Sequence, residues 1–185
     1  MDEATAAFLR GDLSTARGLF EVLAATGSKG ALLALAKIYE RGGTGVSQDL
    51  DKARYWYERA FSEANAVNAA LWLGHFYCDG RGVAVNYDKA FFYYSKLANS
   101  NDPVALLRLG VLYETGRGVE KDLTKARDFY RCAAHLGNLF ARKNWGVLEI
   151  RRGNWIMGLF QWAWASVQGT PLAFINADDK RLRTS

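Results

Sequence analysis

Apolar residues recur along most of this chain at the three- and four-residue spacing that places them on one face of a helix. Leu106, Leu109, Gly110 and Tyr113 show the pattern, in which the glycine leaves room for a neighbouring helix to approach closely. The apolar runs predict helices at residues 3–10, 12–26, 30–41, 49–62, 67–79, 86–99, 102–115, 122–136, 138–152 and 154–168. The chain is therefore expected to be all-α.

The helical pattern repeats with a period of about 36 residues. Its first half is clearest in Leu73-Gly74-His75-Phe76-Tyr77, which recurs as Leu109-Gly110-Val111-Leu112-Tyr113 and, earlier, as Leu35-Ala36-Lys37-Ile38-Tyr39. Its second half carries a Lys-Ala pair whose alanines are Ala53, Ala90 and Ala126, followed four residues later by Tyr57, Tyr94 and Tyr130. Because three sets of markers occur in the same order at nearly the same interval, each interval is predicted to be one structural unit.

Glycine loops and polar caps divide each unit into two helices. Gly80 and Gly116 are expected to close first helices in the left-handed conformation. Asp49, Asn86 and Asp122 are expected to cap the second helices. Such a hairpin cannot bury its own apolar face, so the hairpins must stack on one another.

Degenerate copies of the second-helix pattern begin at Gly11 and Gly153, which gives five hairpins. The prediction is a single solenoid domain over residues 1–185, with a degenerate hairpin at 1–29, repeats at 30–66, 67–101 and 102–137, a degenerate hairpin at 138–170 and a tail at 171–185.

These residues resemble the Sel-one-like repeat family, a subclass of the tetratricopeptide-like helical repeats. The likeness rests on Ala-x-x-x-Leu-Gly-x-x-Tyr, Gly-x-Gly-Val and Asp-x-x-Lys-Ala-x-x-Tyr-Tyr, clearest in residues 69–94 and 105–130. It covers residues 30–141 well and both ends loosely, and it departs from the pattern at Ala36, which replaces the glycine of the family.

The resemblance implies an α/α superhelical solenoid that acts as a non-enzymatic adaptor or scaffold, often in bacterial assemblies. It implies no catalytic residue and no cofactor. A disulfide-bonded branch of the family has a cysteine pair in each repeat, which this chain lacks, since it contains Cys78 and Cys132 alone.

A solenoid binds its partners through the surface that its first helices share. With Tyr39, Tyr77 and Tyr113 placed in the core, one aligned stripe is predicted to form a groove for a protein or peptide partner. The stripe comprises Leu33, Lys37, Glu40, Leu71, His75, Cys78, Leu107, Val111, Glu114 and Lys143. The leucines are equally suited to packing between repeats, so Lys37, His75 and Glu114 are the preferred contacts.

The last hairpin presents a second candidate surface, because its outward positions have turned apolar. Ile156, Leu159, Phe160 and Trp164 belong to this surface. Three alternatives would shield this apolar surface from water: the following segment with Leu172, Phe174 and Ile175, a homodimer or protein partner, or a membrane surface. A membrane surface would make the chain a peripheral membrane-associated assembly or regulatory factor, which is the alternative function.

Net charge and cysteine content bear on two further questions, nucleic-acid binding and cellular location. The net charge is +5, and the residues after 137 contribute +4 of it over 48 positions, a footprint too weak to indicate nucleic-acid binding. Two cysteines do not make a disulfide framework, and the acidic N-terminus lacks the features of a signal peptide, so a cytoplasmic location is expected, or a periplasmic one for a chain trimmed of its leader.

Two motifs that suggest chemistry are better explained by the repeat. The glycine loops lack the Gly-Lys-Ser/Thr of a phosphate-binding loop and recur with the period. His75 with Cys78, and Cys132 with His135, have metal-ligand spacing but fall on a first and a second helix respectively. No metal site is therefore predicted.

Overall fold

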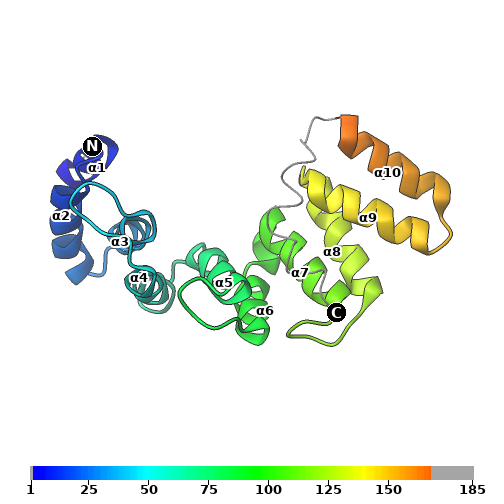
Figure 1. The fold of residues 1–185 in the computed structure, drawn as a ribbon, viewed down its shortest axis with the longest axis horizontal. Coiled ribbons are helices and arrows are strands. Elements are labelled where there is room, and N and C mark those ends of the chain that lie inside the picture. The colour runs from blue at the N-terminus through cyan, green and yellow to red at the C-terminus, as the bar shows by residue number, and fades with distance from the viewer. Residues whose placement is uncertain (1, 168–185) are drawn as a thin grey trace. The chain divides into compact units, whose positions relative to one another are not determined.

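The computed structural model describes residues 2–167 of the chain, and this part is built of helices joined by short loops (Figure 1). The α-helices are α1 (Glu3–Leu9), α2 (Leu13–Ala25), α3 (Lys29–Arg41), α4 (Leu50–Ser62), α5 (Ala69–Asp79), α6 (Tyr87–Ser95), α7 (Pro103–Thr115), α8 (Leu123–His135), α9 (Leu139–Arg151) and α10 (Trp155–Val167), with a short 3₁₀ helix η1 (Ala98–Ser100) after α6. The all-α fold and the predicted order of the helices are confirmed.

Consecutive helices pair into the five predicted hairpins, which fall into two compact units. Of the described residues, unit 1 contains 2–100 and 117–119, and unit 2 contains 101–116 and 120–167. Within unit 1 the first helix of a hairpin packs on the second helix of the hairpin before it, α3 on α2 and α5 on α4. Unit 2 repeats this arrangement with α9 on α8. The stacking buries the apolar face that a single hairpin would leave exposed.

The predicted caps are present at the second helices. The side chains of Asp49, Asn86 and Asp122 accept hydrogen bonds from the backbone N–H groups of the residues three positions later, at 2.9 to 3.0 Å. Gly80 and Gly116 end α5 and α7 with φ of 68° and 71°, in the left-handed region where a side chain would add strain.

The glycines inside the first helices let two helices of a hairpin touch. A Cβ atom on Gly74 would collide with the ring of Tyr94, and one on Gly110 with the ring of Tyr130. Both tyrosines are completely buried. In each of these two repeats the tyrosine ring of the second helix fills the space that a side chain at the glycine of the first helix would occupy.

Two details of the sequence prediction are wrong. The helix expected at 86–99 ends at Ser95, where the serine hydroxyl donates to the carbonyl of Phe92 and the chain turns into η1. A hydroxyl that bonds the backbone locally competes with helical hydrogen bonding. Tyr39 and Tyr77 are buried as expected, but Tyr113 is half-buried and stacks on Phe129 at the edge of its core.

The aspartate caps are expected to make the free energy of unfolding fall at acid pH. Hydrogen bonds from the backbone N–H and the side chain of Lys52 hold the pKa of Asp49 below its ordinary value of 3.8. Since the folded pKa is the lower one, the cap contributes stability above about pH 4 and loses it as the pH falls through the folded value. Asp49→Asn, which keeps the acceptor, is expected to weaken this acid-side loss in urea unfolding measured from about pH 6 down to about pH 2.

Asp88→Asn is the matched control for this prediction. Asp88 is exposed and lies in the first turn of α6, where Asn86 already provides a cap without a charge. Equal acid sensitivity of the wild type and Asp49→Asn would contradict the assignment.

Candidate functional site

The predicted stripe in unit 1 lies along α3 and α5. Its residues differ in solvent exposure and in whether their polar groups already bond within the protein. Lys37 is exposed, whereas Leu33 is half-buried against the core of unit 1. In the described part of the chain the ammonium of Lys37 has no hydrogen bond or ion pair, so it is available to a ligand. Leu71 is half-buried on α5.

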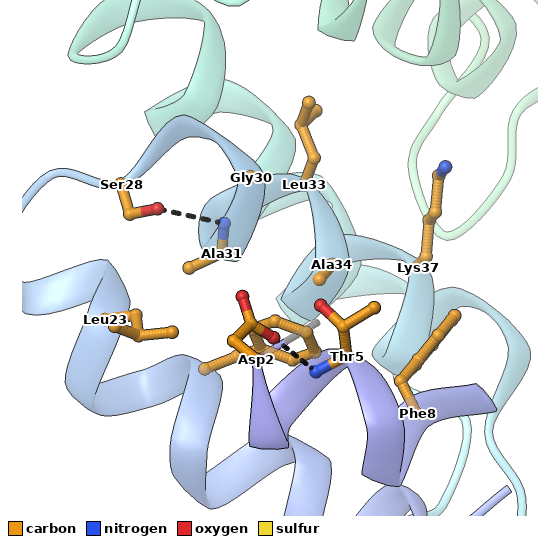
Figure 2. A pocket seen from close by; sticks show the side chains of 11 residues that line it. Asp2, Thr5, Phe8, Leu23, Ser28, Gly30, Ala31, Leu33, Ala34 and Lys37 are labelled. Atoms are coloured by element: carbon orange, nitrogen blue, oxygen red, sulfur yellow. Dashed lines mark hydrogen bonds between the residues drawn. The ribbon is translucent and has the colours of Figure 1, made fainter. Parts of the chain in front are cut away.

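A pocket of about 360 Å³ opens beside Leu33 and Lys37. Figure 2 shows it between α1, α2 and α3, with Leu23 on one side and Phe8 and Lys37 on the other. Its lining residues are Asp2, Thr5, Phe8, Phe20, Leu23, Ser28, Gly30, Ala31, Leu33, Ala34 and Lys37. We call this pocket, together with the exposed side of α3, the α1–α3 groove.

Apolar side chains line much of the α1–α3 groove, and its acidic and hydroxyl groups are largely engaged in caps. Asp2 Oδ1 accepts from the Thr5 N–H at 2.7 Å, and Ser28 Oγ accepts from the Ala31 N–H at 3.5 Å. Phe8 and Phe20 pack edge to face, with ring centroids 6.4 Å apart. The groove thus offers an apolar surface with one uncommitted cation, the ammonium of Lys37, among its lining residues.

Glu40, a predicted contact residue, is committed to the fold of unit 1. Its Oε2 accepts from the hydroxyl of Tyr57 at 2.7 Å, and its Oε1 accepts from the guanidinium of Arg81, also at 2.7 Å. The Glu40 side chain is only 12% exposed. Burial, followed by the Glu40 carboxylate, raises the pKa of Tyr57 well above its ordinary value, which keeps the hydroxyl protonated as a donor.

His75 and Cys78 occupy the corresponding places on α5. His75 Nδ1 lies 3.1 Å from the hydroxyl of Tyr94, so the histidine takes the role that Glu40 has in the preceding hairpin. Its ring also lies close to that of Trp72, with centroids 6.2 Å apart. Both His75 and Cys78 are half-buried, so only part of each side chain reaches the surface.

Unit 2 contains the other predicted groove residues. Leu107 and Val111 are half-buried against its core, as expected if they serve packing. Glu114 repeats the arrangement of Glu40: its Oε2 accepts from Tyr130 at 2.8 Å and its Oε1 from Arg151 at 3.0 Å. Lys143 is half-buried, with its Nζ 6.0 Å from the ring centroid of Trp162.

The second predicted surface lies on α10, on the far side of α9 from α7 and α8 (Figure 1). Ile156, Leu159, Phe160 and Trp164 are all exposed there, with Ile156 87% and Phe160 60% accessible. The predicted cover by Leu172, Phe174 and Ile175 lies outside the described residues.

The motifs of metal-ligand type form no cluster in the described residues. Nowhere in residues 2–167 do three His, Cys, Asp or Glu side chains gather as metal ligands would. Cys78 is half-buried and Cys132 is exposed.

Sequence reasoning missed the residues that complete these contacts. Arg81 reaches back 41 positions to Glu40, and Arg151 reaches back 37 positions to Glu114. The Gly-Arg-Gly of the loops, which recurs around Arg81 and Arg117, was the available signal for the first. Phe8 and Asp2 of the α1–α3 groove have no repeat-wide marker, because α1 belongs to the degenerate hairpin. Phe20 occupies the place of the second-helix tyrosine, which marks it as a packing residue and gave no sign that it lines a pocket.

Stacked helical hairpins that repeat at a regular interval along the chain define the class of α-solenoid repeat proteins. The Sel1 repeat model matches residues 30–65, 67–102 and 103–138, and the chain belongs to this family. The resemblance found from the sequence is thereby confirmed.

Known relatives share the fold or part of the sequence. A protective antigen of uropathogenic Escherichia coli with an SLR fold superimposes with a TM-score of 0.75 at 29% identity, covering 83% of this chain and 33% of the other. A Sel1 repeat protein from Oxalobacter formigenes gives a TM-score of 0.71 at 27% identity, covering 85% and 65%. The ERAD-associated E3 ubiquitin-protein ligase component HRD3B of Arabidopsis thaliana is 38% identical over 88 residues, which are 45% of this chain and 13% of the plant protein. The match thus spans only a small part of that curated relative.

Proposed function

We propose that this chain is a non-enzymatic protein–protein interaction scaffold whose main contact is the α1–α3 groove of unit 1. Sel1 repeat proteins are generally scaffolds that bind protein partners, which supports the general role. The observation that carries the particular site is the pocket of about 360 Å³ beside the uncommitted Lys37. The name of HRD3B, a component of a ubiquitin ligase, agrees with a role in an assembly.

The ligand that suits this groove is a peptide or a partner helix with an apolar side chain next to a carboxylate. The apolar side chain would be removed from water against Phe8, Phe20 and Leu33. The carboxylate would pair with the Lys37 ammonium, which selects the register and orientation of the ligand.

Substitutions in the groove are expected to abolish partner capture without unfolding the protein. Wild type, Lys37→Glu and Leu33→Ala serve as baits in a pull-down from native lysate, with captured proteins and lipids both identified. Circular dichroism first establishes that each variant is folded, because Leu33 also packs on the core of unit 1. A partner specific to the wild type is expected to fall about tenfold or more with either variant, because one loses the charge pair and the other the apolar contact.

Lys121→Glu is the matched control, because Lys121 is an exposed lysine of unit 2 that does not line the pocket. It makes the same change of charge as Lys37→Glu and is expected to keep the partner. Capture that is equal for the wild type and both groove variants would refute the site. Glu40, His75 and Glu114 are left unchanged in this test, since each holds a buried tyrosine hydroxyl and its loss would alter folding as well as binding.

The alternative proposal, a peripheral membrane-associated assembly or regulatory factor, uses the C-terminal hairpin instead. It rests on the exposed apolar side chains of α10 and does not compete with the groove, so both surfaces are testable in the same protein. We also propose a cytoplasmic location for the chain, and a homodimer is the alternative cover for α10.

A further inference from the structure

Helix α10 exposes more large apolar side chains than any other helix of the described chain. Eight of its large apolar side chains are exposed: Trp155, Ile156, Met157, Leu159, Phe160, Trp162, Trp164 and Val167. Helix α10 contains no charged residue. Exposed apolar surface of this extent marks an interaction site in a water-soluble protein.

The exposed side chains surround α10 instead of forming one stripe. Gly158, Gln161 and Ala165 are buried, and they define the single line along which α10 meets α9. At 3.6 residues per turn, Trp155 and Trp162 lie on one flank of that line, Ile156 and Phe160 lie opposite it, and Trp164 lies on the other flank. A packed partner helix covers one stripe of roughly 100°. The lipid interface is fluid and conforms to a wider arc.

The charges beside α10 are predominantly positive. Arg151 and Arg152 directly precede the helix, and the guanidinium of Arg142 lies 3.9 Å above the ring of Trp164. Arg151 is paired with Glu114, which leaves Arg152 and the ammonium of Lys143 as the less committed cations.

The one carboxylate of the hairpin at residues 138–167, Glu149, is buried, where it accepts hydrogen bonds from Trp145 and Asn154. The exposed charges of the hairpin are therefore complementary to an anionic surface.

We propose that α10 docks this chain on the surface of an anionic lipid bilayer. Ile156 and Phe160 enter the boundary between headgroups and acyl chains, the tryptophans lie at headgroup level, and the basic residues of α9 and of the turn face the lipid phosphates. The helix lies in the plane of the interface. Among the described helices, none has the length and apolar content that crossing a bilayer requires.

Vesicle flotation of the full chain tests this proposal. Vesicles of phosphatidylcholine, with and without phosphatidylserine, are mixed with wild type, with an Ile156→Asp/Phe160→Asp variant and with Val22→Asp. Val22 is 70% exposed on α2, so it controls for the same change at another exposed apolar site. Wild type and Val22→Asp are expected to float with phosphatidylserine vesicles, less at high salt, and the double variant about tenfold less. Circular dichroism confirms that each variant is folded.

Other outcomes would overturn the proposal and separate a second copy from an unoccupied face. Wild type that stays with the unbound fraction overturns the proposal. If light scattering then gives the mass of two chains for the wild type and of one chain for the double variant, a second copy covers α10. If the unbound wild type has the mass of one chain, neither a bilayer nor a second copy occupies this face. Flotation of the double variant at the wild-type level would also overturn the assignment to Ile156 and Phe160.

Discussion

Replacing Gly74 with leucine is expected to lower the free energy of unfolding by about 1 to 3 kcal/mol or more. Even one added carbon at this position of α5 would overlap the ring of Tyr94. Tyr94 cannot move aside freely, because it is completely buried and its hydroxyl is held beside His75. The side chain of leucine must therefore push the two helices of the hairpin apart. Urea unfolding followed by circular dichroism measures the loss.

Gly18→Leu on α2 is the matched control for Gly74→Leu. A Cβ atom at Gly18 would meet nothing within 4 Å, and leucine is a better helix former than glycine by somewhat less than about 1 kcal/mol. The same substitution is thus expected to leave stability unchanged or raise it slightly at position 18. A wild-type unfolding midpoint for Gly74→Leu would show that the helix contact is not the reason for the glycine.

Removing the carboxylate of Glu40 is expected to destabilise unit 1 by about 1 to 3 kcal/mol. Glu40→Ala leaves the hydroxyl of the completely buried Tyr57 without its acceptor and Arg81 without its anion. A buried donor that loses its partner costs more than a hydrogen bond contributes, because it was already removed from water. The ion pair with Arg81, which is 35% exposed, adds less.

A double-mutant cycle with Tyr57→Phe isolates this contact. In the Tyr57→Phe background no hydroxyl is left to be orphaned, so Glu40→Ala is expected to cost clearly less there than in the wild type. Identical costs in the two backgrounds would show that Glu40 does not stabilise the protein through Tyr57. This outcome would return Glu40 to the set of residues free to contact a partner.

Local features of the sequence were sufficient to predict the hairpins. The caps at Asp49, Asn86 and Asp122 and the left-handed glycines at 80 and 116 act within a few residues, so their spacing alone indicates where helices begin and end. Gly74 and Gly110 were recognised as close contacts for the same reason, since each recurs with a tyrosine at a fixed distance along the chain. The end of α6 was predicted four residues too late. The hydroxyl of Ser95 can point to solvent or bond to a nearby backbone carbonyl, as it does to that of Phe92, and the sequence pattern does not distinguish these two conformations.

The candidate groove was predicted only in part. Leu33 and Lys37 lie on the expected face and line a pocket, but that pocket also needs Asp2, Phe8 and Phe20 from the degenerate first hairpin. Glu40 and Glu114 belong to the same predicted stripe as Lys37, yet their carboxylates bond buried tyrosines and arginines more than thirty residues away. The stripe therefore contains both residues that are available to a ligand, such as Lys37, and residues that hold the fold, such as Glu40 and Glu114.

The sequence by itself determined the repeat, the helices, their caps and the apolar character of α10, because these depend on the order of residue types along one or two turns. Tertiary structure decided which polar side chains are free. Whether Lys37 or Glu40 can meet a ligand depends on which residues of other helices come within hydrogen-bonding distance, as Tyr57 and Arg81 do for Glu40. Hydrogen bonds act over about 3 Å, and only the packing of helices brings residues that are distant in sequence within that range.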